Sequence, residues 1–228
     1  MIAAVHQPQY LPWLGYLDKL DRADIFVILS TVQYKKNEYQ NRNRIKTAQG
    51  WQWLTVPVRY RFPQRIDEVT VNNDVNWRHK HRQALITNYA RSPYFEAHLP
   101  FLDKLYGQNW DRLADLNVRT VLNLMDALGI TSPVRQASEW TLSEDPTGRL
   151  VDICRRTEAD TYLSGSGGQA YLDLKQFDDA GIHVIFQDYR HPEYPQQFGG
   201  FEPYMSAVDL LFNCGPRSLE ILRSGRQQ

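Results

Sequence analysis

The stretch MIAAVHQPQYLPWLGYLDKLDRADIFVILS, residues 1–30, decides the fold of this 228-residue chain. It contains two short apolar runs, Ile2–Val5 and Ile25–Leu29, which have the composition of buried strands in a parallel sheet. Between them, leucines recur at three-residue intervals over Leu11–Leu20, the spacing of one face of a short helix. A strand, a helix and a second strand of this length predict a right-handed βαβ unit, with the charged helix residues such as Lys19 exposed.

The same alternation of strands and helices returns in the C-terminal half. Between the two halves, the sequence predicts a β-ribbon followed by helices. The expected strands are Val134–Ala137, Thr161–Leu163 and Ile182–Phe186, and the expected helices include Trp77–Tyr89, Asp111–Leu128, Pro146–Arg156 and Gln169–Asp179. We therefore expect one α/β domain over residues 1–228, a Rossmann-like three-layer parallel sheet with an insertion of β-ribbon and helices at about residues 45–130.

The charge balance disfavours a nucleic-acid partner. Acidic and basic residues are equal in number, 26 of each, so no global field attracts a polyanion. Residues 35–65 are locally basic, however, and contain a single acid, Glu38. This segment suits an anionic small-molecule ligand, and nothing in the composition decides whether the chain forms a homo-oligomer.

Signals for membranes, metals and disulfides are weak in this sequence. No apolar run approaches the roughly 18 residues of a membrane span, and Met1 leads directly into a strand, so we expect a cytoplasmic protein without a membrane span. Cys154 and Cys214 lie in apolar helical contexts that favour buried, reduced thiols. No Cys or His spacing matches a zinc site, and we expect no metal site.

The first candidate site residue is His6, which follows the first strand directly. The carboxyl ends of parallel strands hold the ligands of open α/β sheets, so a side chain here would reach a binding cleft. A lone histidine is more often a structural hydrogen-bonding group, but Gln7, Gln9 and Tyr10 add donors and acceptors beside it. We expect His6 to be catalytic and its three polar neighbours to bind substrate.

A second polar cluster follows the second strand, in residues 31–50, which we expect to be too polar to enter the core. Amide side chains recognise planar polar groups, and a guanidinium binds carboxylate or phosphate. A solvated loop would explain the lysines equally well, and the two interpretations are evenly matched. The candidate substrate-binding residues of this cluster are Gln33, Tyr34, Lys35, Asn41, Arg42 and Asn43.

A glycine-rich turn follows the strand at Thr161–Leu163. Its backbone N–H groups could approach a phosphate or carboxylate, although its spacing is neither that of a P-loop nor that of a dinucleotide-binding loop. Asp188 and His191 follow the next strand and could line the same cleft. The candidate substrate-binding residues of the turn are Ser164, Gly165, Ser166, Gly167 and Gly168.

Several segments together resemble the WbqC-like family. They are HQPQYLPWLGY at residues 6–16, VQY at 32–34, NRN at 41–43, YLSG at 162–165 and DLLFNCG at 209–215. The resemblance covers nearly the whole chain. It implies a bacterial protein linked to O-antigen or other surface-polysaccharide and sugar-derivative biosynthesis, and it implies no particular reaction.

A more distant resemblance concerns the fold. The sequence is similar to nucleotidylyltransferases of the pantoate synthetase type, which belong to the HUP-like folds and carry a His-x-Gly-His motif after their first strand. Here Pro8 replaces the glycine and Gln9 replaces the second histidine. A glutamine cannot offer a transition state the positive charge of an imidazolium, so adenylyl transfer does not follow from the resemblance.

Two functions remain open from the sequence. The first is a transferase or ligase that binds a nucleotide-sugar or an activated acyl or aminoacyl donor, with a nucleotide as the cofactor to be tested. The second is a non-catalytic descendant of the nucleotidylyltransferase fold that binds a ligand or a partner. The density of polar groups at the strand ends favours the enzyme, and the missing second histidine favours the binding protein.

Overall fold

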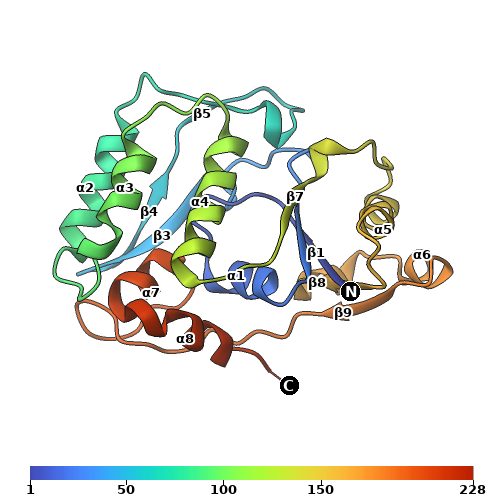
Figure 1. Ribbon diagram of the computed structural model, residues 1–228. Helices are drawn as coiled ribbons and strands as arrows, with labels where there is room; N and C mark the ends of the chain where they lie inside the picture. The colour runs from blue at the N-terminus through green and yellow to red at the C-terminus, as the bar shows by residue number, and fades with distance from the viewer. Residues whose placement is uncertain (228) are drawn as a thin grey trace.

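A five-stranded parallel sheet forms the centre of the protein (Figure 1). The computed structural model describes residues 1–227. The strands lie in the order β7-β2-β1-β8-β9, so the chain runs outward from β1 to β7 and then returns to the other side of β1. The order therefore reverses between β1 and β8. The strands are β1 (Ile2–His6), β2 (Ile25–Ile28), β7 (Val134–Gln136), β8 (Thr161–Ser164) and β9 (His183–Phe186).

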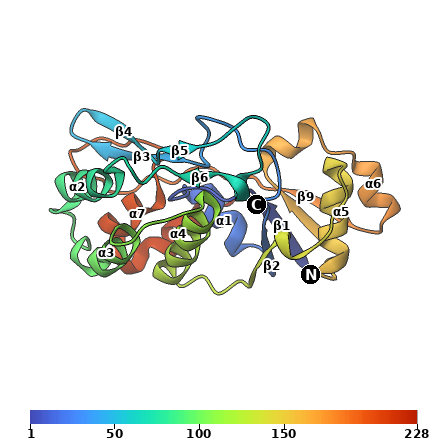
Figure 2. The same ribbon diagram turned by 90° about the horizontal axis from the view of Figure 1, so that it is seen from above.

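Helices cover both faces of this sheet, as the alternation of its side chains requires. Val5, Val27 and Tyr162 pack on one face against α5 (Pro146–Arg156) and α6 (Leu174–Asp179). The intervening strand residues pack on the other face against α1 (Leu14–Asp21), and Figure 2 shows α1 and α5 on opposite sides of the sheet. The expected Rossmann-like three-layer α/β fold is confirmed.

The segment between β2 and β7 forms the β-ribbon and helices that the sequence predicts. Its core is continuous with the α1 face of the sheet, and the last two helices of the chain pack against it (Figure 1). Its elements are β3 (Arg42–Thr47), β4 (Gly50–Thr55), β5 (Val58–Arg59), η1 (Ile66–Glu68), β6 (Thr70–Val71), α2 (Trp77–Tyr89), η2 (Glu96–His98), α3 (Leu99–Tyr106) and α4 (Leu113–Leu128). The remaining elements are η3 (Ala137–Glu139), η4 (Ser166–Ala170), α7 (Ala207–Cys214), η5 (Gly215–Arg217) and α8 (Ser218–Ser224).

Local signals placed several elements correctly. The helix expected over Trp77–Tyr89 is α2 with the same bounds. Helix α5 begins at Pro146, and the Asp145 side chain accepts the Gly148 N–H, as expected for a capped helix with proline in its first turn. The free thiols of Cys154 and Cys214 are buried, which confirms their expected state.

Two predictions about local structure are wrong. Residues 31–50 looked too polar to enter the core, but Arg42–Thr47 forms β3, and the hairpin of β3 and β4 buries Ile45 completely. The helix expected over Gln169–Asp179 begins only at Leu174, because Asp173 accepts the Lys175 N–H and caps it there. The preceding glycines form the short 3₁₀ turn η4 instead.

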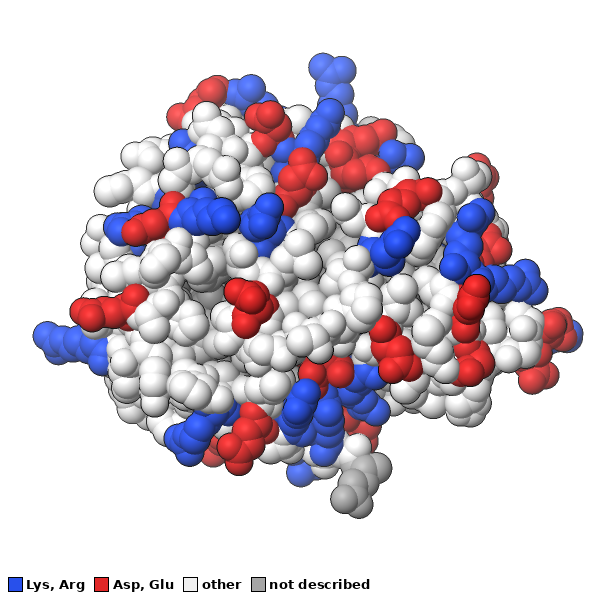
Figure 3. All heavy atoms as spheres, in the orientation of Figure 1, with Lys and Arg blue, Asp and Glu red and all other residues white. Residues whose placement is uncertain are grey.

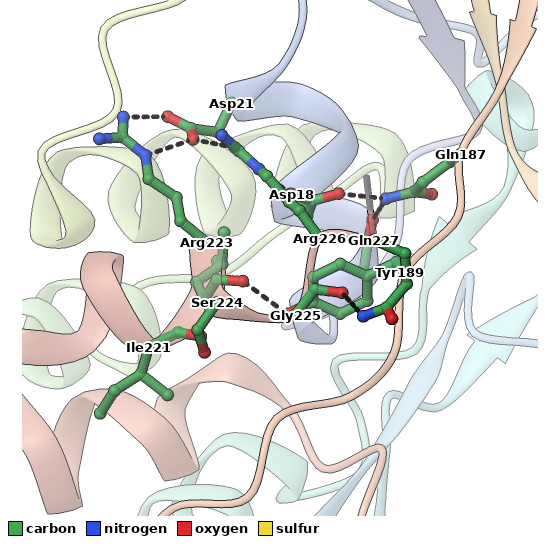
Figure 4. A network of polar contacts seen from close by, with 12 residues as sticks. Asp18, Asp21, Gln187, Tyr189, Ile221, Arg223, Ser224, Gly225, Arg226 and Gln227 are labelled. Atoms are coloured by element: carbon green, nitrogen blue, oxygen red, sulfur yellow. Dashed lines mark hydrogen bonds and ion pairs between the residues drawn. The ribbon is translucent and has the colours of Figure 1, made fainter.

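The C-terminal segment holds α1 from its outer side (Figure 4). Arg226 donates to Asp18 (2.7 Å) and pairs with Asp21, and Arg223 also pairs with Asp21 (2.8 Å). Gln187 donates a further hydrogen bond to Asp18 (2.7 Å). Asp18 is therefore fully buried rather than exposed, because Arg226 from the far end of the chain neutralises its charge.

Lys19 on the same helix is buried as well, with 3% of its surface exposed, so the expectation of an exposed lysine is wrong. Figure 3 shows basic and acidic side chains interspersed over one face of the molecule.

Candidate functional site

Three neighbouring cavities open at the carboxyl ends of β1, β2 and β8, and His6 lines all three. Their volumes are about 560, 370 and 250 Å³. We call them together the cleft. It lies beside β1 and β8, where the strand order reverses, which is the position at which open α/β sheets bind their ligands.

The cleft exists because β1 and β8 separate before they end. The pairing of β1 with β2 continues to His6 and Ile28, whereas its pairing with β8 stops at Ala4 and Leu163. The last residues of β1 therefore have no strand beside them on the β8 side. A space large enough for a ligand lies where further residue pairs between β1 and β8 would otherwise form.

His6 presents one free ring nitrogen to the cleft. Its Nδ1 donates to the Gln7 carbonyl oxygen (3.0 Å), since a carbonyl only accepts, and Nε2 then carries the lone pair. Among residues 1–227, no group forms a hydrogen bond with Nε2. Burial lowers the pKa of His6 to about 3, with a contribution from the Lys19 charge, so the ring is neutral at physiological pH.

Gln40 fastens the loop after β2 to the end of β1. Its Nε2 donates to the Gln7 side-chain oxygen (2.6 Å), and its Oε1 accepts the Lys35 N–H (2.9 Å). These bonds hold Lys35 at the wall of two of the cavities. The buried Oε1 of Gln9, which lines the smallest of the three cavities together with Lys35, accepts no hydrogen bond within the described residues.

The glycine turn forms the opposite wall. A Cβ built on Gly165 or Gly167 would meet no atom within 4 Å, so both residues face open space. Gly168 differs, because its Cβ would lie 2.0 Å from the Ser164 hydroxyl oxygen. The first two glycines therefore leave room for a ligand, and the third allows the turn to close on β8.

The structure brings together most of the residues expected at the first strand and the glycine turn. Asp188 also lines the cleft, beside Tyr189. The cleft contains the expected residues His6, Gln7, Gln9, Lys35, Ser164, Gly165, Ser166, Gly167, Gly168 and Asp188.

Tyr10, Asn41 and Asn43 lie in the core and do not line the cleft. The Tyr10 hydroxyl bonds to His81 (2.9 Å) and Tyr106 (2.7 Å). Asn43 donates to the Leu11 carbonyl (2.7 Å), and Asn41 donates to a carbonyl of the inserted ribbon. Both amide N–H groups bind main-chain carbonyls, whereas the buried Oδ1 of Asn41 accepts no hydrogen bond within the described residues. These placements put the three side chains outside the three cavities.

Gln33, Tyr34, Arg42 and His191 also lie outside the three cavities. Gln33 is exposed, and Tyr34 packs against Tyr60 (4.8 Å between ring centres). The Arg42 guanidinium lies 4.1 Å from the ring centre of Trp53 on the ribbon. His191 stacks on Trp13 (6.4 Å) and donates to the Pro192 carbonyl oxygen. Packing partners from other segments hold Tyr34, Arg42 and His191.

Sequence reasoning missed several residues of the cleft. Tyr16 and Lys19 lie three residues apart on α1 and thus share one face, a signal that could have identified them. Arg149 of α5 and Tyr162 of β8 carried no local signal. The missed cleft residues include Tyr16, Lys19, Tyr39, Gln40, Arg149, Tyr162, Tyr171 and Gln187.

Within residues 1–227, no group of three or more His, Cys, Asp or Glu side chains is placed to hold a metal ion. No helix in this part of the chain is long and apolar enough to cross a membrane.

A parallel sheet with a polar cleft at the reversal of strand order defines the protein as a Rossmann-like α/β protein. The chain belongs to the WbqC-like protein family, whose model matches residues 7–221. It is 37% identical over 228 residues to the uncharacterized protein Rv1507c of Mycobacterium tuberculosis, with 98% of each chain covered. No solved structure gives a significant match to the chain.

Proposed function

We propose that this protein is a transferase or ligase that binds an anionic donor in the cleft. The donor would be a nucleotide-sugar or an activated acyl or aminoacyl group, and the pathway would be surface-polysaccharide or sugar-derivative biosynthesis. The observation that carries the proposal is the meeting of three cavities at His6, where the strand order reverses.

The polar groups of the cleft suit this kind of donor. Lys35 and Arg149 supply positive charge on the walls, and the open side of Gly165 and Gly167 lets a ligand approach the main chain. His6 Nε2 can accept a proton from an attacking hydroxyl or amine. An anionic donor beside His6 would raise its low pKa, because a nearby opposite charge favours the imidazolium.

A second candidate function is ligand binding without catalysis. One observation favours it: burial lowers the pKa of His6 to about 3, and an imidazole with so low a pKa is a weak base until a ligand changes its surroundings. Gln9 also stands where the nucleotidylyltransferases that the sequence distantly resembles carry a second histidine.

A thermal-shift screen with nucleotides, nucleotide-sugars and acyl carriers tests the proposal. A ligand of the folded state raises the melting temperature in step with the logarithm of its concentration over its dissociation constant. We expect a shift in the wild type that His6→Ala reduces and His183→Ala, at an exposed position of β9, leaves unchanged. Equal shifts in all three proteins would place the ligand outside the cleft.

Turnover separates the two functions. Incubation of the stabilising ligand with protein and candidate acceptors should release a nucleotide or free carrier, and His6→Ala should slow that release by about 10²-fold or more. Binding with no product from any acceptor would support the non-catalytic function.

A further inference from the structure

We propose that Lys19 is the residue that binds the anionic group of the ligand, a phosphate or a carboxylate, at the base of the cleft. This inference rests on the proposed function for the cleft itself, but it adds the recognition residue and the chemistry it recognises. It follows from the position of the Lys19 ammonium group, from its single bond and from the charges around it.

The Lys19 side chain occupies the gap between β1 and β8. It begins on α1, on one face of the sheet, and its Nζ lies 5.9 Å from the ring centre of Tyr162, which packs on the other face. Nζ donates to the carbonyl oxygen of Val5 (2.8 Å), just beyond the last pair of β1 and β8, Ala4 and Leu163. The separation of the strands thus positions the ammonium at the floor of the cleft.

That ammonium has donors to spare. An ammonium group donates three hydrogen bonds, and within residues 1–227 Nζ makes one, to the Val5 carbonyl. No carboxylate of the described residues lies within ion-pair distance of it. Asp18, its neighbour in sequence, is bound to Arg226 and Gln187 instead (Figure 4). Two donors and an unneutralised charge remain for a ligand.

Both larger cavities reach this group, so one lysine can contact an anion from either side. Burial lowers the pKa of Lys19 to about 7, because a charged amine without a counter-ion is costly in a desolvated place. A bound anion removes that cost and restores the charge. The titratable groups facing the same space are His6, Tyr16, Lys35, Arg149, Tyr162, Tyr171, Asp188 and Tyr189.

Titration calorimetry with inorganic pyrophosphate and with succinate tests the proposal. The two probes distinguish a phosphate from a carboxylate, and matched sodium chloride controls for ionic strength. We expect Lys19→Met to weaken binding of the preferred probe at least about tenfold, since a hydrogen bond to a charged group is lost. Lys104→Met, at an exposed position of α3, should bind as the wild type does.

A second measurement follows proton uptake in the wild type and in the charge-conserving variant Lys19→Arg. At about pH 8, in two buffers of different ionisation enthalpy, the wild type should take up as much as about one proton on binding, because the anion raises the pKa of Lys19. Lys19→Arg should bind without that uptake, since a guanidinium is always charged. If the anion bound elsewhere in the cleft, another group would take up the proton, and the uptake would persist in Lys19→Met and Lys19→Arg.

The inference is overturned if neither probe binds the wild type at about 10 mM, or if Lys19→Met binds the preferred probe with an unchanged dissociation constant. Its failure can be distinguished from failure of the proposed function. A nucleotide-sugar that stabilises the wild type and Lys19→Met equally, but not His6→Ala, would keep the cleft and exclude Lys19 as its anion contact.

Discussion

His6 and the three glycines of the turn after β8 show how single residues shape the cleft. His6 is neutral because the fold buries it, and its tautomer follows from one bond to the Gln7 carbonyl. Gly165 and Gly167 face open space, whereas Gly168 is packed against Ser164. Residues of one type in one turn therefore serve different purposes.

Alanine substitutions separate these purposes. Gly165→Ala and Gly167→Ala should change the free energy of unfolding by less than about 1 kcal/mol, because no atom obstructs the new methyl group. They should weaken ligand binding by filling the space the ligand needs. Gly168→Ala should cost about 1–3 kcal/mol, because its methyl group displaces the Ser164 hydroxyl. Urea denaturation and titration of the screened ligand measure both effects. Tight binding by Gly167→Ala would contradict a ligand at this wall.

His81 contributes to the response of stability to acid, as does His6, whose pKa is also lowered by burial. Burial lowers its pKa from 6.5 to about 4, and it lies between the Tyr10 hydroxyl and the Thr55 carbonyl. As the pH falls, the His81 imidazole of the unfolded chain is protonated before that of the folded protein. The stability that His81 contributes is therefore fully present above about pH 6.5 and is lost as the pH falls towards 4. The loss should reach about 3 kcal/mol.

Denaturation curves between pH 7 and 4 measure this loss. His81→Gln should make the pH dependence shallower, with the part that His6 contributes remaining, and His183→Gln, at an exposed position, should keep the slope of the wild type. The same slope in both variants would show that another group binds the proton.

At the scale of elements, α1 is the part that places Lys19 and Tyr16 in the cleft. Two arginines from the end of the chain hold it through Asp18 and Asp21 (Figure 4). Asp18 is fully buried, so the loss of its partner leaves a buried charge unpaired.

Removal of the two arginines one at a time should have unequal effects. Arg226→Met should cost about 2–4 kcal/mol, because Asp18 is then left without its ion pair. Arg223→Met should cost less than about 1 kcal/mol, since Arg223 is half exposed and Asp21 keeps Arg226. Thermal denaturation of both variants compares them directly. Equal losses would mean that α1 does not depend on the buried pair.

For the whole molecule, local patterns predicted the architecture well. Apolar runs and helix caps placed β1, β2, α2 and α5, and the order of strands and helices gave the three-layer sheet. They failed where polar residues enter the core. Strand β3 was missed because its polar groups bind distant segments: Asn43 donates to the Leu11 carbonyl, and the Lys46 N–H donates to the Tyr89 hydroxyl.

The candidate site was predictable only in part for the same reason. An amide that binds a ligand and an amide that binds a distant carbonyl have the same sequence signature, so Asn41 and Asn43 were assigned to the site rather than to the core. Lys19 looked exposed because its acceptor, the Val5 carbonyl, is free only where β1 and β8 separate. That gap is a property of the assembled sheet.

The location of the ligand tests the central claim most directly. Amide hydrogen exchange of the wild type, with and without the ligand of largest thermal shift, reports which segments a ligand protects. We predict protection of residues 5–9 and 164–168, the two walls of the cleft. Protection confined to the β3–β4 ribbon or to the outer helices, with both walls unchanged, would contradict a binding site at the separation of β1 and β8.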